Sequence, residues 1–280
     1  VIYALLVGAI AVILQRLTRP LKALTHRVEH FAATRDASNP MVPSGPADVR
    51  QLITAHNALE GRIAALLDEK DVMLGAIGHD LKTPLAALRV RIETVDDEAQ
   101  RAKMAATIDD IARSLDDILS LARVGRPGDP LEVTDLTALT AQVVEEFEDM
   151  GDAVGFAGAE RITLRLRPTW LRRALRNLVG NALRHGGGAA RVDLKRQPGT
   201  VTITVEDDGP GIPADEIARM LEPFTRGDPS RNRGTGGAGL GLTLARAIAE
   251  QHGGSLTLAN RASDDGGVAG LTASLTLPLT

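Results

Sequence analysis

The chain has 280 residues, of which 44% are hydrophobic and 24% charged, and its formal net charge is −4 at pH 7. This length exceeds one average domain, which favours two or three folded modules. The mild acidity argues against a basic nucleic-acid-binding surface, and the composition is not that of a disordered chain. The absence of cysteine excludes disulfides and thiolate metal sites and suits a reducing compartment.

The first fourteen residues, VIYALLVGAIAVIL, are wholly apolar, and the basic residues Arg16, Arg19 and Lys22 come directly after them. The run is shorter than the roughly 20 residues that cross a bilayer, but the chain begins with Val, so we expect the segment to be truncated. A signal peptide would carry its charges before the apolar run. Residues 1–15 are therefore interpreted as a transmembrane segment, with a buried helix as the alternative. The basic flank predicts a cytoplasmic location for the rest of the chain.

Helical periodicity from Leu17 to about Phe31 is broken by the proline-containing stretch ATRDASNPMVPSGPAD and resumes near Val49. From there apolar residues recur every seven positions, at 52, 59, 66 and 73, which predicts a parallel coiled coil with polar residues, His56 and Lys70, at its other seam position. Two helices joined by an extended connector after a membrane segment resemble a HAMP linker domain, here residues 16–68. A generic helical linker is the alternative.

The heptad continues into residues 72–95, and a second helix is predicted from about Glu98 to Val124, after the acidic turn DDEAQ. Helices that expose so much apolar surface are expected to form an antiparallel hairpin and to dimerise into a four-helix bundle. The apolar seam of the second helix contains Met104, Ile108, Ile111, Leu115, Ile118 and Ala122. GRPGDP, residues 125–130, is typical of a linker.

Beyond this linker, helical runs at residues 137–150 and 169–185 alternate with β-rich runs. These are ERITLRL, ARVDLKR, GTVTITVED, GSLTLAN and GLTASLTLPL. Helices among several alternating strands predict an α+β sandwich in which one sheet is covered by helices on one face.

Four polar clusters stand in order in this module. In NLVGNALRHG, Asn177 and Asn181 lie four apart and share one face of a helix. In DDGPGI, which comes after a strand, glycines let the backbone approach a ligand and Asp207 can accept a hydrogen bond from an amine. EPF precedes a polar stretch whose arginines could meet phosphate charge. GTGGAGLGLTLARAIAEQHGG runs into an amphipathic helix, whose first amides can bind anions.

Each cluster alone is a weak signal, but their order and spacing resemble the N, first glycine, F and second glycine boxes of the GHKL ATP-binding fold. The resemblance implies a Bergerat pocket in which Asp207 takes the adenine amino group and Asn181, supported by Asn177, carries Mg²⁺ beside the phosphates. The other nucleotide-binding positions that it implies are Gly209, Gly211, Phe224, Arg226, Gly237, Gly239, Leu240 and Gly241.

The stretch GAIGHDLKTPL, residues 75–85, resembles the H box of the HisKA dimerisation domain. Gyrase B, Hsp90 and MutL, which share the GHKL fold, have no such helix, so the combination resembles a bacterial two-component sensor histidine kinase, in particular the osmosensing EnvZ subgroup. We therefore expect residues 69–126 to form the HisKA domain and residues 131–280 the ATP-binding catalytic domain. The kinase modules would lie on the cytoplasmic side of the inner membrane.

The H box predicts the chemistry. His79 is expected to face solvent, where its imidazole can attack the γ-phosphate of ATP, and Asp80 could orient it or accept its proton. The resemblance implies transfer to an aspartate of a response regulator and a phosphatase role for Thr83. Pro84 predicts a kink.

Two other functions are weighed against this prediction. The first is a silent nucleotide-binding membrane scaffold, against which the intact motifs argue. The second, an ATP-driven clamp of the gyrase type, would need a large partner domain that the sequence lacks.

Overall fold

A computed structural model describes residues 2–34, 36–124, 130–158, 160–223, 225, 239–263 and 267–279. The chain forms two compact units, the first containing Val1–Ile77 and the second Gly78–Gly125 with Asp129–Thr280. One long helix, α2 (Ala47–Ile92), contributes to both units.

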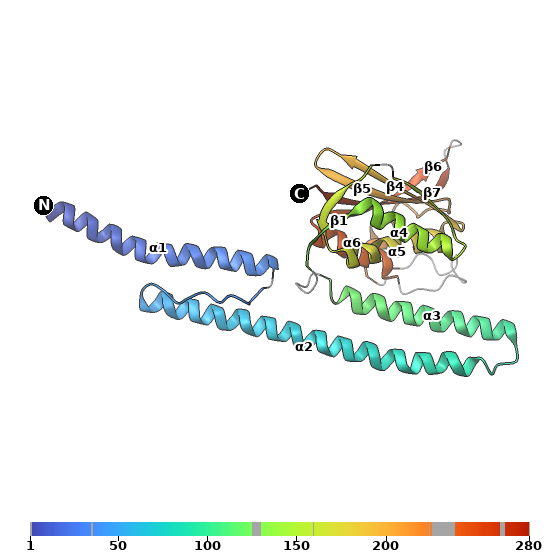
Figure 1. The fold of residues 1–280 in the computed structure, drawn as a ribbon, viewed down its shortest axis with the longest axis horizontal. Helices are drawn as coiled ribbons and strands as arrows, with labels where there is room; N and C mark the ends of the chain where they lie inside the picture. Colours follow the sequence, from blue (N-terminus) through green and yellow to red (C-terminus); the bar gives the residue numbers. More distant parts are fainter. Residues whose placement is uncertain are drawn as a thin grey trace. The chain divides into compact units, whose positions relative to one another are not determined.

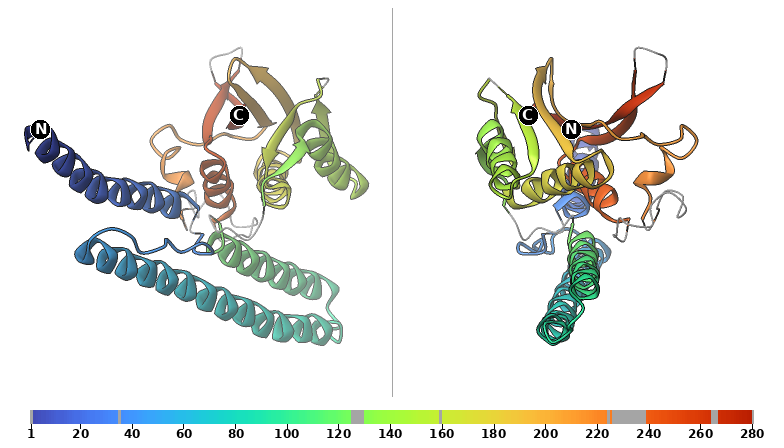
Figure 2. Two further views of the ribbon diagram at one scale, coloured as in Figure 1. Left: turned by 60° about the vertical axis from the view of Figure 1, so that its left-hand side comes forward. Right: turned by 90° about the vertical axis from the view of Figure 1, so that its right-hand side faces the viewer.

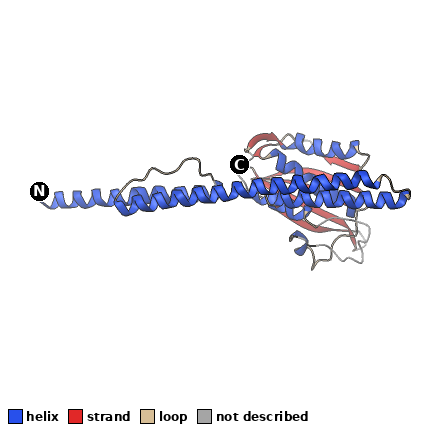
Figure 3. Cartoon of the chain, turned by 90° about the horizontal axis from the view of Figure 1, so that it is seen from below, coloured by secondary structure: helices blue, strands red, loops and turns tan. Residues whose placement is uncertain are grey.

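In the first unit, α1 (Ile2–Thr34) lies beside the beginning of α2, and an extended connector joins them (Figure 3). The connector contacts both helices. Asn57 of α2 bonds the backbone of Met41 twice, through Oδ1 at 3.1 Å and Nδ2 at 2.8 Å. Gly45, with φ of +94°, lies so close to α1 that an added Cβ would be 3.1 Å from Pro20 Cγ. The unit thus has the two helices and extended connector that the sequence predicts.

A charged cluster lies between α1 and α2 in this unit. Glu60 is 2% exposed, and its carboxylate accepts hydrogen bonds of 3.0 and 2.8 Å from the guanidinium of Arg27. His56 Nε2 lies 2.9 Å from the same carboxylate. A charge buried in a folded protein is strongly destabilising unless it is paired. His56 is therefore here a partner of the buried Glu60 carboxylate.

The stretch Ile2–Ala32 within α1 is long and apolar enough to cross a membrane, judged by length and composition. Its apolar side chains, among them Ile2, Leu5 and Ile13, are exposed. Residues 2–15 of the predicted segment 1–15 lie within it.

In the second unit, the end of α2 forms an antiparallel hairpin with α3 (Glu98–Leu121) (Figure 1). Asp97 caps α3 by accepting a hydrogen bond from Gln100 N, as N-cap residues do. Ion pairs join the helices at Lys82 Nζ–Asp116 Oδ1, 2.8 Å apart, and at Arg89–Asp109. The second helix begins at the predicted residue and ends three residues earlier than predicted.

The rest of the second unit is an α+β sandwich. Its elements are β1 (Glu132–Asp135), α4 (Leu136–Asp149), β2 (Ala153–Ala157), β3 (Thr163–Leu166), α5 (Pro168–His185), β4 (Ala189–Gln197), β5 (Thr200–Asp207), the 3₁₀ turn η1 (Arg219–Leu221), α6 (Gly241–Gln251), β6 (Ser255–Ala262) and β7 (Val268–Pro278).

The strands form two sheets, so the prediction of one sheet was wrong. Five strands pair in the order β2-β4-β5-β7-β6, whereas β1 and β3 form a separate antiparallel pair. The segment ERITLRL, expected in the main sheet, contributes β3 to this small sheet. This strand has only four residues, and its backbone hydrogen bonds go to β1, from Glu132↔Leu166 to Asp135↔Thr163. Because it pairs with β1, it does not join the main sheet.

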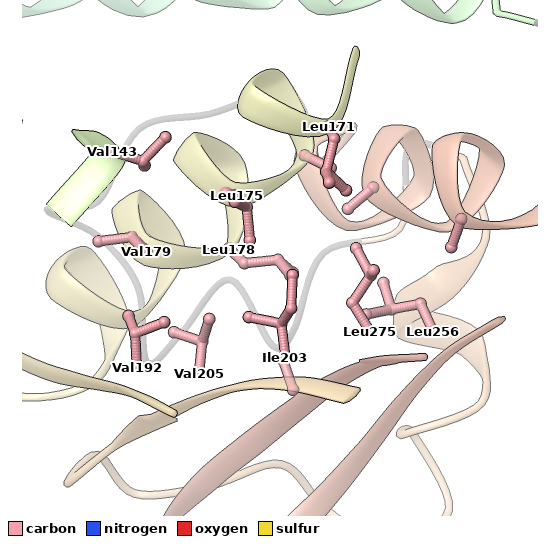
Figure 4. Close-up of a cluster of buried hydrophobic side chains, with 14 of the residues drawn as sticks. Val143, Leu171, Leu175, Leu178, Val179, Val192, Ile203, Val205, Leu256 and Leu275 are labelled. Atoms are coloured by element: carbon pink, nitrogen blue, oxygen red, sulfur yellow. The ribbon is translucent and has the colours of Figure 1, made fainter. Parts of the chain in front are cut away.

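Helices α4, α5 and α6 cover one face of the five-stranded sheet (Figure 2). Leucines repeat along α5 at helical spacing, and Leu171, Leu175 and Leu178 are at most 2% exposed. They point toward Ile203 and the other apolar strand residues (Figure 4). Burial alternates along β5, with its valines and Ile203 facing the helices. This alternation continues to the last residue of β5, Asp207, whose side chain is therefore buried on the same face of the sheet.

Candidate functional site

Asp207 is the buried acid of the predicted nucleotide pocket, and only 6% of it is exposed. Its Oδ1 accepts hydrogen bonds from Gly209 N at 2.9 Å and from Leu271 N at 3.1 Å. Both bonds use Oδ1, so within the described part of the chain Oδ2 can accept a further donor. A half-satisfied buried carboxylate at a strand end is suited to bind an amino group of a ligand.

Glycines around Asp207 let three backbone segments approach one another. A Cβ on Gly186, just after α5, would lie 2.1 Å from Asp207 Cβ, and one on Gly209 would lie 2.6 Å from the carbonyl oxygen of His185. Gly211 has φ of +68°, and its Cβ would lie 2.7 Å from Asn260 Oδ1. Larger residues at these positions would push the loop away from α5 or from β6.

Asn177, the first of the two predicted asparagines on α5, contacts the start of α6. Asn177 is half-buried on α5, and its Nδ2 lies 3.5 Å from the carbonyl oxygen of Gly241, the first residue of α6. Asn181 comes one turn later and is also half-buried. Gly239 has φ of +68°, and Leu240, which is 1% exposed, anchors the helix start. The structure thus brings Asn177 together with Gly241, and Asp207 with Gly209.

Three predicted nucleotide-binding residues, Phe224, Arg226 and Gly237, lie outside the described residues.

The chemistry of the donors around Asn181 decides whether it suits a metal ion. Among the described residues, no three histidine, aspartate or glutamate side chains gather into a metal-binding group. Mg²⁺ bound with nucleotide takes most of its ligands from phosphates and water, so it needs few protein oxygens. The amide oxygen of Asn181 fits that donor set.

The predicted phosphoacceptor group lies on α2. The His79 side chain is 84% exposed, and its Nδ1 is 3.5 Å from Asp80 Oδ1. Thr83 lies one turn further and donates a 3.1 Å hydrogen bond to the carbonyl oxygen of His79. The helix continues through Pro84 to Ile92. The imidazole is therefore accessible to a second reactant and has a carboxylate beside it.

Gly78, which precedes His79, explains part of this motif by packing. A Cβ on Gly78 would lie 2.6 Å from Leu119 Cδ1 of α3. Leu119 is 7% exposed, so its side chain fills the space that a larger residue would need. The glycine therefore lets α3 pack closely behind the histidine.

The sequence motifs missed a set of polar residues around Asp208. The Arg191 guanidinium binds the Asp208 carboxylate through two nitrogens, at 2.9 and 2.7 Å, and Arg261 Nη2 contacts Oδ1 of the same carboxylate. These hydrogen bonds, with Arg191 the stronger partner, lower the pKa of Asp208 to about 2. Only the adjacent letters NR in a strand could have drawn attention to Arg261, and they are not specific.

The comparisons with known proteins agree with this architecture. The family model described as "Histidine kinase-, DNA gyrase B-, and HSP90-like ATPase" matches residues 166–280. The sensor histidine kinase GtrS of Pseudomonas aeruginosa is 32% identical over 261 residues, which cover 93% of this chain and 53% of GtrS. The sensor protein BasS of Escherichia coli is 30% identical over 265 residues, which cover 90% of this chain and 71% of BasS. The chain belongs to the sensor histidine kinases.

This sensor histidine kinase shares its fold with a solved structure. The full-length structure of ShkA in complex with AMPPNP has a TM-score of 0.57 and 23% identity over 74% of this chain and 46% of that chain. The predicted family and its GHKL-type ATPase domain are confirmed. The chain spans about half the length of GtrS, the first of these relatives.

Proposed function

We propose that the chain is the signalling portion of a membrane-bound sensor histidine kinase that transfers the γ-phosphoryl group of ATP to His79. The observation that carries this proposal is an exposed histidine with an adjacent carboxylate in a chain of this family that also keeps a buried acid at the expected nucleotide pocket. The phosphoryl group would then pass to an aspartate of a response regulator.

ATP recognition is assigned to the loops around Asp207. Its free Oδ2 is proposed to accept a hydrogen bond from the adenine amino group, while Gly209 and Gly211 leave room for the base. The first amides of α6, near Asn177, would face the phosphates. Mg²⁺, held by Asn181 with Asn177 in support, would neutralise phosphate charge. The predicted lid residues Arg226 and Gly237 would complete the pocket.

Phosphotransfer is assigned to His79. The neutral imidazole has a free electron pair on one nitrogen, and that nitrogen attacks the γ-phosphorus in line while ADP leaves. Asp80, 3.5 Å from Nδ1, can orient the ring. It can also accept the proton from the nitrogen that does not attack, as the ring becomes positively charged. The exposure of the ring lets both ATP and a response regulator reach it.

A second activity, dephosphorylation of the regulator, is assigned to Thr83. Its hydroxyl is exposed on the helix and donates to the carbonyl oxygen of His79, which leaves its lone pairs able to accept a hydrogen bond from water. A water held there would lie beside the bound regulator aspartate.

The proposal includes the modules that carry these sites. Residues 1–15 would anchor the chain in the bacterial inner membrane, and residues 16–68 would form a HAMP linker, which the helix pair and connector of the first unit support. Residues 69–126 would form a homodimeric HisKA bundle and residues 131–280 the catalytic domain. The kinase modules would lie in the cytoplasm.

Incubation of the full chain with γ-labelled ATP and Mg²⁺ tests the proposal. We expect a protein-bound label that is stable to alkali and labile to acid, and we expect His79→Gln to remove it. His56→Gln is the matched control, because His56 lies in the first unit beside Glu60, and it should keep the label.

A silent nucleotide-binding scaffold is the alternative function. It predicts ATP binding without any label on the intact chain. An equal label in His79→Gln and in the intact chain would instead assign the phosphoacceptor to another residue.

A further inference from the structure

The glycine-rich loop after β5 is held at its far end by Asn260, a residue of β6. Asn260 Oδ1 accepts a hydrogen bond from Ile212 N at 2.9 Å, and its Nδ2 donates one to the Ile212 carbonyl oxygen at 2.6 Å. The side-chain amide therefore pairs with the backbone of one residue as a neighbouring strand would. Since Ile212 ends the motif DDGPGI, this pair fixes where the loop ends.

The near end of the same loop is held by the next residue, Arg261. Its Nη2 contacts the Asp208 carboxylate and donates to the carbonyl oxygens of Asp207 and Ala269, both at 3.1 Å. Arg191 of β4 also binds Asp208, through both carboxylate oxygens. Charge-assisted hydrogen bonds of this kind are stronger than neutral ones, and the low pKa of Asp208 is consistent with a carboxylate that stays ionised between two arginines.

Arg261 can reach this position because the residue opposite it on the neighbouring strand is a glycine. Strand β7 lies between β6 and β5, and Gly270 of β7 is the residue paired with Arg261. Gly270 has φ of +150°, and an added Cβ would lie 1.8 Å from the Asp207 carbonyl oxygen and 3.2 Å from Arg261 Nη2. The strand register shifts between Arg261 and Ala262, directly after this crossing. The guanidinium therefore passes over the middle strand at a residue without a side chain.

These contacts act on the carboxylate that the proposed function uses. The Asp207 carbonyl oxygen binds Arg261, and its Oδ1 is held by Gly209 N within this loop as well as by Leu271 N of β7. If either end of the loop shifted, Gly209 N would move and the direction of Oδ2 would change. The two neighbouring side chains of β6 thus control the geometry of one acceptor atom.

We propose that Asn260 and Arg261 are positioning residues for adenine recognition, which hold both ends of the DDGPGI loop so that Asp207 Oδ2 faces the amino group of the base. This inference rests on the proposed role of Asp207 as the adenine acceptor. It adds that adenine recognition requires two side chains of strand β6, and that Gly270 must lack a side chain for Arg261 to reach the loop.

The test compares two nucleotides on the full chain in detergent with Mg²⁺. ATP and purine riboside 5′-triphosphate, which has hydrogen in place of the adenine amino group, each compete with a fluorescent ATP analogue. The intact chain should prefer ATP by about tenfold or more, as expected for a hydrogen bond to a charged acceptor. In Arg261→Ala the affinity for ATP should fall about tenfold, whereas that for purine riboside triphosphate should change less than about twofold.

Two further variants separate positioning from loss of structure. Arg261→Lys keeps the charge but not the forked donor, so it should restore part of the preference for ATP. Asp208→Asn keeps the shape of the side chain and weakens both arginine contacts, so it should reduce the preference in the same direction. Arg196→Ala, an exposed arginine of β4 that pairs with Glu160, is the matched control and should leave both affinities unchanged.

The outcomes are distinguishable. An unchanged preference for ATP in Arg261→Ala and Asp208→Asn, or an equal loss of both nucleotides in both variants, overturns the positioning role. If the intact chain binds ATP without any preference, the acceptor role of Asp207 fails and the inference falls with it. If the intact chain prefers ATP and only the variants lose that preference, both hold.

Discussion

His252 joins two helices that are far apart in the sequence. It comes directly after α6, and its ring Nδ1 lies 2.7 Å from the carbonyl oxygen of Ile248, whereas Nε2 accepts a hydrogen bond from Arg167 N at 3.0 Å, just before α5. A carbonyl can only accept, so Nδ1 carries the proton and the ring is neutral. Burial lowers the pKa of His252 below its usual 6.5.

The lowered pKa of His252 predicts that the catalytic domain loses stability in acid. Below about pH 6.5 the unfolded chain binds a proton that the folded ring resists, so the free energy of unfolding falls with pH, by at most about 1.4 kcal/mol per unit for one proton. Urea unfolding at pH 7.5 and 5.5, followed by fluorescence of Trp170 on α5, should show a lower midpoint at pH 5.5. His252→Gln should reduce this difference, and an undiminished difference would contradict the assignment.

Individual site residues differ in how far the sequence predicts them. Asp207 was predicted because a motif names it, and in the structure the alternating burial of β5 extends to it. Asn260 and Arg261 were not predicted, since their partners lie about 50 residues away. The contact depends on the strand order β5-β7-β6 and on Gly270 lying opposite Arg261. Neither fact can be obtained from the local pattern.

At the scale of elements, α2 carries both the phosphoacceptor and a proline. The helix runs unbroken from Ala47 to Ile92 and contains Pro84. Proline has no N–H to donate to the carbonyl oxygen of Asp80, and its ring crowds that carbonyl, which weakens the helix there by about 3 kcal/mol. The weak point lies one turn beyond His79. A bend there would change the orientation of the part of α2 that carries the groups for the two proposed activities.

Replacing Pro84 by Ala should stiffen α2 and change the ratio of kinase to phosphatase activity by about threefold or more. The new N–H restores the missing hydrogen bond, so the helical signal should also melt at higher temperature. Autophosphorylation and regulator dephosphorylation would be measured on the same preparation. Arg91→Ala, an exposed change in the last turn of α2, is the control. A raised melting temperature with an unchanged ratio would remove the switching role.

The elements that periodicity predicted are the long ones. The helices α3, α4 and α5 and the strands β4 to β7 have clear periods and were predicted within a few residues. The strands β1 and β2 were missed, because four or five residues are too few to establish an alternation. β3 was predicted as a strand but assigned to the wrong sheet, since pairing partners are a property of the tertiary structure.

At the scale of the whole molecule, the hairpin of α2 and α3 leaves an apolar surface uncovered. Large apolar residues recur every seven positions on both helices and are 38% to 49% exposed. They are Leu81 and Leu88 on α2 and Met104, Ile111 and Ile118 on α3. Seven-residue spacing is that of a helix-bundle seam. Such a row would be costly in water for a single chain, and the proposed homodimer would cover it.

A charge within this row should therefore separate the subunits. Ile111→Asp would bury a carboxylate in each copy of the seam, at a cost of about 2 kcal/mol per copy or roughly a thousandfold in the dissociation constant of a dimer. Ala106→Asp adds the same carboxylate to the same helix at an exposed position outside the row and is the control. Sedimentation of the detergent-solubilised chains should show dimers for the intact chain and for the control, and monomers for Ile111→Asp. Dimers of unchanged affinity in Ile111→Asp would mean that another surface holds the subunits together.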